Sequence, residues 1–278
     1  MTDEPKLRYI SLGAGVQSSA LYVCSELGLH GVARADAAIF ADTGNEPPWV
    51  YETLEKIREW GSIPVEICSK GNLGDDIKAK ARGEGSDFFA PIPAYTPREG
   101  YTDKESMLRR QCTREYKITP IEKEARRLLG YKPRQRIAPG SAAAMIGISM
   151  DEVQRMKPSR TRWITNEYPL IDAGLYRQHC RSIVIEHLGF EPQRSACVFC
   201  PYLSNREWRM LRELDREGWE YAIAFDDAMR SMTKGGDSRP IYVHRSLKPL
   251  AEADIDEDDS QGKLWDNFAG ECEGMCGV

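Results

Sequence analysis

The sequence contains no apolar run of about 18 residues, the length that a membrane-spanning helix needs, so we expect no membrane span. Its first residues, Met1 to Pro5, carry acidic side chains and lack an apolar stretch, unlike a secretory signal peptide. We therefore expect a cytoplasmic protein. In that reducing compartment, the eight cysteines favour metal or redox chemistry over structural disulfides.

Two common nucleotide motifs are also missing. No Gly-Lys-Ser/Thr follows the glycine loop near the N-terminus, which excludes a Walker loop, and the third glycine position of a dinucleotide fingerprint is Ser18. The four histidines show no metal-ligand spacing apart from His179, which lies beside Cys180. We expect the other three to be structural: His30, His187 and His244.

The net charge of −5 is unevenly distributed. Between Lys78 and Arg136 there are 15 Lys and Arg against 8 Asp and Glu, whereas Ala251 to Gly262 holds six acids and no base. The basic segment suits nucleotide phosphates or nucleic acid, and a solvated helix face is the alternative. We expect the acidic segment to be a solvated linker.

A loop of small residues is the most informative feature that is present. The apolar run from Leu7 to Leu12 leads into this loop and then into a stretch with helical spacing, Ala20 to Cys24. Such a loop offers free backbone N–H groups and the positive end of a helix dipole to an anion. The candidate phosphate-binding residues are Ser11, Gly13, Ala14, Gly15, Gln17, Ser18 and Ser19. A plain strand–helix turn is the alternative.

Apolar periodicity predicts alternating strands and helices. We expect strands at 7–12, 37–41, 63–68 and 142–148, and helices at 18–27, 49–60, 72–82, 120–129, 174–189 and within 204–230. Residues 88–101, rich in proline and aromatic side chains, predict a long ordered loop or lid. This alternation indicates an α/β fold with a doubly wound parallel sheet and a site at the carboxyl ends of its strands.

The spacing of Cys197 and Cys200 is the clearest cysteine signal. A Cys-x-x-Cys pair followed by Pro201 can hold two corners of a zinc ion or one edge of an iron–sulfur cluster. A plain redox or unliganded pair is the third interpretation. Cys180, beside His179, is a candidate for a further ligand. The two cysteines within predicted elements, Cys24 and Cys68, are expected to be small core residues.

The loop from Gly13 to Ser18 resembles the PP-loop, Ser-Gly-Gly-x-Asp-Ser, of ATP pyrophosphatases and phosphoadenylylsulfate (PAPS) reductases. Gly15 and Ser18 match that motif, whereas Gly13, Ala14 and Gln17 depart from it. Four later segments resemble motifs of the same superfamily in the same order, over residues 7 to 205 in all. They are Asp42-Thr43-Gly44, the Cys112 to Pro120 segment with one cysteine lost, Gly147 to Arg155, and Pro169-Leu170-Ile171-Asp172 without the following tryptophan.

The resemblance implies a fold and a nucleotide site. Residues 1–205 would form an adenine nucleotide alpha hydrolase-like, Rossmann-like domain, and residues 206–278 a helical extension with the acidic loop and a cysteine-containing tail. ATP, with Mg²⁺, would bind the loop residues together with Asp42, Thr43, Gly44, Gly147 and Arg155. Asp42 would be a catalytic residue that orients the nucleotide or magnesium, or it would cap its turn. Candidate phosphate or substrate contacts, or else solvent-facing charges, are Arg110, Arg114, Lys117 and Arg160.

The resemblance also implies an activity. The protein would split ATP between its α and β phosphates to adenylate an acceptor, and would deliver sulfur through a persulfide or a 4Fe-4S cluster. The cluster ligands would be Cys112, Cys197 and Cys200, with Cys180 as a further candidate. The acceptor would be nucleic acid, as in tRNA thiolation or DNA phosphorothioation, with a cysteine desulfurase or thioredoxin-like protein as donor. An oligomer is compatible with this function.

Two other functions stay open. The Glu271-Cys272 to Cys276 ending resembles an expanded form of the Glu-Cys-Gly-Leu-His tail of PAPS reductases. Cys272 and Cys276 would then be catalytic nucleophiles of a thiol-dependent PAPS or APS reductase that releases sulfite, or carriers of a persulfide; an incidental or ligating tail is the alternative. Gln17 in place of the loop aspartate favours a third function, a zinc-stabilised, non-catalytic nucleotide- or nucleic-acid-binding module.

Overall fold

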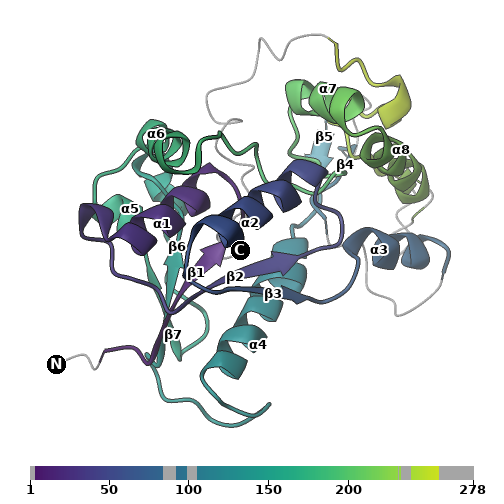
Figure 1. Ribbon diagram of the computed structural model, residues 1–278. Helices are drawn as coiled ribbons and strands as arrows, with labels where there is room; N and C mark the ends of the chain where they lie inside the picture. Colours follow the sequence, from purple (N-terminus) through teal and green to yellow (C-terminus); the bar gives the residue numbers. More distant parts are fainter. Residues whose placement is uncertain (1–3, 84–91, 99–104, 231, 233–238, 257–278) are drawn as a thin grey trace.

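A five-stranded parallel sheet is the centre of the structure, a computed structural model that describes residues 4–83, 92–98, 105–230, 232 and 239–256 (Figure 1). The strands lie in the order β3-β2-β1-β6-β7. Their bounds are β1 (Leu7–Leu12), β2 (Ala37–Asp42), β3 (Val65–Ser69), β6 (Ala142–Ile146) and β7 (Ile164–Glu167). The chain builds outward from β1 on one side and then crosses to β6 on the other, so the topological switch point lies between β1 and β6.

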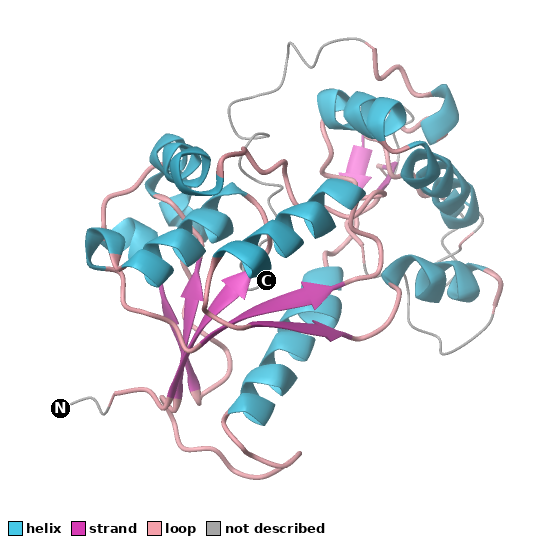
Figure 2. Ribbon diagram, in the orientation of Figure 1, coloured by secondary structure: helices cyan, strands magenta, loops and turns pink. Residues whose placement is uncertain are grey.

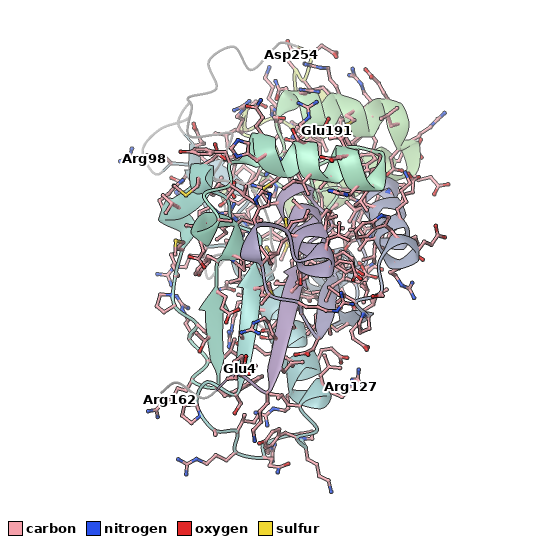
Figure 3. The ribbon with its side chains drawn as sticks, turned by 60° about the vertical axis from the view of Figure 1, so that its left-hand side comes forward. Glu4, Arg98, Arg127, Arg162, Glu191 and Asp254 are labelled. Carbon is pink, nitrogen blue, oxygen red and sulfur yellow. The ribbon has the colours of Figure 1, made fainter. Side chains whose placement is uncertain are left out.

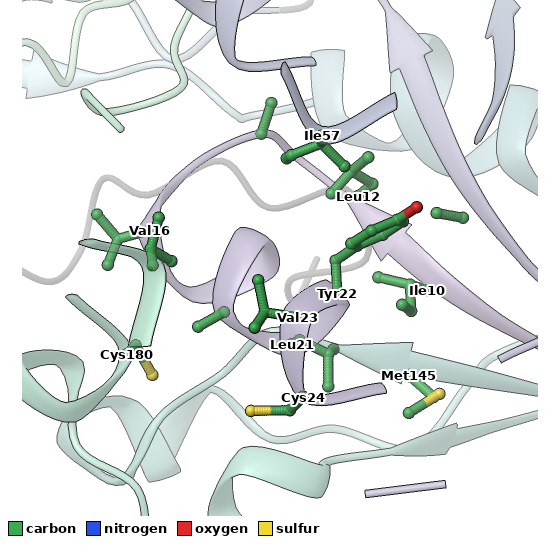
Figure 4. Packing of buried hydrophobic residues seen from close by; sticks show 14 of the residues in the cluster. Ile10, Leu12, Val16, Leu21, Tyr22, Val23, Cys24, Ile57, Met145 and Cys180 are labelled. Carbon is green, nitrogen blue, oxygen red and sulfur yellow. The ribbon is translucent and has the colours of Figure 1, made fainter. Parts of the chain in front are cut away.

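Helices cover both faces of this sheet (Figure 2). The helices α1 (Val16–Leu27), α2 (Pro48–Trp60) and α6 (Arg177–Leu188) pack on one face, over Ile10, Leu12 and Phe40 (Figure 4). The helix α4 (Thr119–Leu128) packs on the other face, over Tyr9 and Ile39. Because alternate residues of each strand enter opposite cores, the strands read as continuous apolar runs. The predicted doubly wound α/β sheet is confirmed at this level.

A second apolar core lies beside the sheet. It joins α3 (Leu73–Ala81), α7 (Asn205–Leu214) and α8 (Arg216–Arg230) to Phe199 and to residues 241–255. The carboxylate of Asp226 in α8 connects this helix to residues 241–255. It accepts hydrogen bonds from the backbone N–H groups of Val243 (2.9 Å) and Leu250 (3.0 Å). A domain boundary drawn at residue 205 would pass through this shared core.

The remaining elements are short. They are β4 (Tyr95–Pro97), β5 (Glu105–Met107), α5 (Pro169–Asp172), a π-helical turn over Thr113–Ile118, and 3₁₀ turns over Leu29–Gly31, Met150–Arg155 and Leu250–Glu252. Within the described part of the chain, no helix is both long and apolar enough to cross a membrane.

Most predicted elements are confirmed to within a few residues, but the short elements β4, β5, α5 and β7 were not predicted. The expected loop over 88–101 contains β4 in its described part, 92–98, because Tyr95 to Pro97 pairs with β5 and bridges to Tyr242. The edge strand β7 was missed. Residues 88–91 and 99–101 of that expected loop lie outside the described residues, as does the acidic and cysteine-containing segment 257–278.

Candidate functional site

The small-residue loop lies at the carboxyl end of β1, at the switch point of the sheet. Its backbone turns sharply at Ala14, whose φ of 56° is in the left-handed region. Ser18, in the first turn of α1, holds the turn closed: its hydroxyl accepts hydrogen bonds from the backbone N–H groups of Gly13 (3.2 Å) and Gly15 (3.3 Å). The loop is therefore ordered by its own residues and presents the N-terminus of α1 at the position where open α/β sheets bind ligands.

Three buried serine hydroxyls surround this loop without a hydrogen-bond partner in the described part of the chain. Ser11 lies near the end of β1, and Ser19 lies in the first turn of α1. Ser195 lies beside Gly15, where an added Cβ would be 3.8 Å from it. Buried polar groups in native proteins are nearly always hydrogen-bonded, so an unpaired group requires an explanation. Hydroxyl donors beside a helix N-terminus suit a bound anion such as a phosphate.

A network of buried polar side chains supports the first turn of α1 from the side of β6. The side-chain amide of Gln17 donates to Glu152 (3.1 Å) and accepts from the guanidinium of Arg177 (2.9 Å). Glu152 also forms an ion pair with Arg155. Gln17 and Glu152 are fully buried, so the network fixes two arginines beside the loop. Arg155 was predicted for this site, and Gly147 lies buried just after β6 as expected.

The second predicted segment forms a tight turn after β2. The carboxylate of Asp42 accepts hydrogen bonds from the backbone N–H of Gly44 (2.7 Å) and the hydroxyl of Tyr51 (2.9 Å). Gly44 has a φ of +73°, and an added Cβ would lie 3.1 Å from the side chain of Asn72. Asp42 therefore caps this turn, which was one of the two roles expected for it.

Thr43 links this turn to the Cys-x-x-Cys pair. Its hydroxyl lies 3.3 Å from the sulfur of Cys197 and 3.2 Å from the carboxylate of Glu46. Glu46 forms an ion pair with Lys117 (3.2 Å), and the two side chains are 0% and 7% exposed respectively. The charge of Lys117 therefore compensates a fully buried carboxylate beside the thiol.

Three of the four predicted ligand cysteines line one pocket. Its empty volume, which includes space open to solvent, is about 420 Å³, and Cys112, Cys197 and Cys200 contribute to its wall. Arg110 and Lys117, which were predicted to contact a phosphate or substrate, line the same pocket. The rest of its wall is Thr43, Leu73, Ile92, Pro93, Phe199, Pro201 and Tyr202. The pocket therefore combines thiols, two cations and apolar walls.

The Cys197 thiol is held in its neutral form in this environment. Burial raises its pKa well above the ordinary value, and the charge of Glu46 raises it further. Lys117 and the Thr43 hydroxyl oppose the shift. Because the thiolate is both the nucleophile and the metal ligand, Cys197 needs a further positive charge before it reacts or ligates.

The structure does not bring Cys180 to the other three cysteines. Cys180 is buried in α6, in the core that α6 shares with α1 (Figure 4). Cys24 lies in the same core, as expected. Cys68, expected to be a core residue, is partly buried at the end of β3. No group of three or more His, Cys, Asp or Glu within the described residues is placed closely enough to hold a metal ion.

Two other predicted arginines lie away from the loop. Arg114 pairs with Glu122 (3.1 Å), which also accepts a hydrogen bond from Thr161, the residue after Arg160. Both arginines are thus placed near the start of α4. Arg162, which follows the predicted strand over 142–148, does not lie at the carboxyl end of the sheet: Figure 3 shows it with Glu4 and Arg127 at the end where the strands begin. The reason is that β7, which starts at Ile164, runs parallel to β6. The connection from β6 to β7 must therefore return to the end of the sheet where the strands begin.

One short segment joins the loop to the thiol pocket. Ser195 lies beside Gly15, where an added Cβ would be 3.8 Å from it. The backbone N–H of Val198 donates to the carbonyl of Asn45 (2.9 Å), and Cys197 contacts Thr43. The two sites are therefore adjacent at the carboxyl edge of the sheet. This adjacency is what the arrangement offers chemically: an anion site within a few residues of a group of thiols.

Sequence reasoning assigned no role to Ser195, Glu46, Glu152 or Arg177. Glu152 lies within the Gly147 to Arg155 segment and Glu46 lies two residues after Asp42-Thr43-Gly44, so both gave a weak signal, whereas Ser195 and Arg177 gave none. Cys272 and Cys276 lie outside the described residues. Comparison of the sequence with protein-family models and with curated proteins, and of the structure with solved structures, found no match.

Proposed function

We propose that this chain is a PAPS reductase-like ATP pyrophosphatase, with the adenine nucleotide alpha hydrolase-like form of the α/β fold. It would adenylate an acceptor and take part in sulfur transfer to it. The observation that carries this proposal is the adjacency of the anion site and the thiol pocket through Ser195, Val198 and Cys197. An enzyme that activates an acceptor with ATP and then delivers sulfur needs the anion site and the thiols close together, at the same end of the sheet.

The nucleotide part of the proposal rests on the switch-point loop. ATP would place its phosphates at the N-terminus of α1, where the unpaired hydroxyls of Ser11, Ser19 and Ser195 supply donors. Arg155 and Arg177 would add positive charge on the side of β6. Splitting ATP between its α and β phosphates requires that the leaving pyrophosphate be stabilised, which is the role of these donors.

The sulfur part of the proposal rests on the thiol pocket. Cys112, Cys197 and Cys200 are the residues that would hold a 4Fe-4S cluster, because thiolates are its usual ligands and all three line one pocket with apolar walls. In the described part of this structure the three are not placed closely enough to hold a metal ion. Lys117 and Arg110 would offset the negative charge of the thiolates. A bound cluster would supply an iron site for the sulfur to be transferred. Zinc, held by the same cysteines, is the alternative occupant.

The proposed acceptor is nucleic acid, of the tRNA thiolation or DNA phosphorothioation type. The excess of Lys and Arg between residues 78 and 136 supports this choice, because a polyanion binds a basic segment. A cysteine desulfurase or a thioredoxin-like protein would provide the sulfur or the reducing equivalents.

Anaerobic purification followed by iron, sulfide and zinc analysis tests the proposal first. We expect about four irons per chain and a broad absorbance band at about 400 nm. Cys197→Ala should lose the iron, and Cys68→Ala, which alters a thiol of β3, should keep it. One zinc and no iron would contradict the cluster.

A second assay separates the enzymatic functions. Pyrophosphate and AMP formed from ATP in the presence of a sulfur donor and nucleic acid would support the proposal. Sulfite formed from PAPS or APS with a thiol reductant would instead support the reductase. Nucleotide binding without either reaction would support the non-catalytic module.

A further inference from the structure

The fully buried contact between Gln17 and Glu152 carries a further inference. The side-chain amide of Gln17 lies 3.1 Å from a carboxylate oxygen of Glu152, and both residues are 0% exposed. A buried carboxylate must be paired and hydrogen-bonded, and Glu152 has both a charged partner in Arg155 and a neutral donor in Gln17. A second carboxylate at position 17 would face Glu152 without water between them, so residues 17 and 152 accept only one negative charge together.

The other end of the Gln17 side chain reaches a different element. Its carbonyl oxygen accepts a hydrogen bond from the guanidinium of Arg177 (2.9 Å), at the first residue of α6. The helices α1 and α6 pack side by side, and both begin at the carboxyl edge of the sheet (Figure 1). Gln17 thus connects a carboxylate after β6 to an arginine at the start of α6.

We propose that Glu152 is the positioning residue of the phosphate site, and that it orients Arg155 directly and Arg177 through the amide of Gln17. The two guanidinium groups would then meet the negative charge of the phosphate chain beyond the α phosphate. This inference rests on the proposed function, because it needs a nucleotide at the α1 loop. In this arrangement one of the two contacting residues must be an amide and the other a carboxylate, and the carboxylate is Glu152.

Matched charge exchange tests this proposal. The affinities of ATP, ADP and AMP would be measured by calorimetry on the full chain for the wild type, Glu152→Gln, Gln17→Glu and the double variant. Each single variant should bind ATP at least about tenfold more weakly. Glu152→Gln loses the ion pair with Arg155, and Gln17→Glu places two carboxylates in contact. The double variant, which restores one carboxylate and one amide, should recover to within about threefold of the wild type.

The dependence on phosphate number separates positioning from folding. The single variants should lose more affinity for ATP than for AMP, because only the longer phosphate chain needs both arginines. A structural role would weaken the three nucleotides equally. Arg177→Gln, at a partly exposed position, should show the same ATP-selective loss. It removes one donor to the buried Gln17, so its melting temperature should fall by only a few degrees. Arg181→Gln on α6, whose side chain pairs with Glu191 at the surface, is the matched control and should bind all three as the wild type does.

The outcomes are distinguishable. A wild type that binds none of the three nucleotides overturns the proposed function and this inference with it. Two results would overturn this inference alone, provided that the wild type binds ATP. In the first, the affinity losses of the two single variants multiply in the double variant. In the second, the losses are the same for ATP, ADP and AMP.

Discussion

The hydroxyl oxygen of Thr43 lies 3.3 Å from the sulfur of Cys197, so the turn after β2 directly contacts the Cys-x-x-Cys pair. This hydroxyl lowers the pKa of the Cys197 thiol against the effect of burial. Replacing Thr43 with Val should therefore reduce the thiolate fraction. Losing one hydrogen bond of about 1 kcal/mol predicts alkylation of Cys197 that is slower by about fivefold. The rate would be followed by mass spectrometry of the metal-free protein with excess iodoacetamide.

The control for this prediction is Thr43→Ser, which keeps the hydroxyl and should keep the alkylation rate within about twofold of the wild type. Equal rates for Thr43→Val and the wild type would show that the hydroxyl does not stabilise the thiolate. The rate at Cys68, which lies away from the pocket, would be measured in the same samples.

The ion pair between Lys117 and Glu46 should be essential for stability, because it is almost completely buried. Lys117→Met leaves the carboxylate of Glu46 buried without a charged partner. Breaking a buried pair in this way costs about 3–5 kcal/mol, which should appear as a lower free energy of unfolding in urea.

The matched variant removes both charges. Lys117→Met combined with Glu46→Gln leaves no buried ion, so we expect it to recover at least half of the lost stability. A loss in the double variant equal to the sum of the two single losses would show that the pair does not interact.

Stability should fall at alkaline pH because of the Cys24 thiol. Burial in α1 raises its pKa from 9.0 to about 11, so the folded protein keeps the proton that the unfolded chain loses. Its stabilising contribution is complete below pH 9 and is lost as the pH rises towards 11. Between about pH 7.5 and about pH 10.5 this group should account for about 2 kcal/mol. The free energy of unfolding would be measured by urea titration at both pH values. Between them it should fall by about 2 kcal/mol less in Cys24→Ala than in the wild type.

The fold was predictable where local pattern and tertiary burial agree. The strands β1 and β2 are buried on both faces, so their apolar runs marked them in the sequence. The edge strand β7, Ile-Thr-Asn-Glu, carries mostly polar residues, and β4 is three residues long and ends in proline, so neither gave a periodic signal.

The candidate site was predictable where its residues are close in sequence. The loop from Gly13 to Ser18 and the Cys197 and Cys200 pair are local motifs. By contrast, Arg177 meets Gln17 across 160 residues, and Cys197 meets Glu46 across 151. Such contacts depend on where the sheet places its loops, and no local spacing encodes them.

The left-handed backbone of Ala14 predicts a stabilising substitution within the loop. Its φ of 56° places the Cβ of an L-residue too close to the following carbonyl, at a cost of about 1–2 kcal/mol that glycine avoids. Glycine also adds entropy to the unfolded chain and removes a buried methyl group from the core, and each effect offsets about 0.4–1 kcal/mol of that gain. Ala14→Gly should therefore raise the free energy of unfolding by up to about 1 kcal/mol in urea titrations. Ala20→Gly, in the interior of α1, is the control and should lower it, since glycine there has poor helix propensity and leaves a small void. Destabilisation by Ala14→Gly would show that the loop does not hold this backbone conformation.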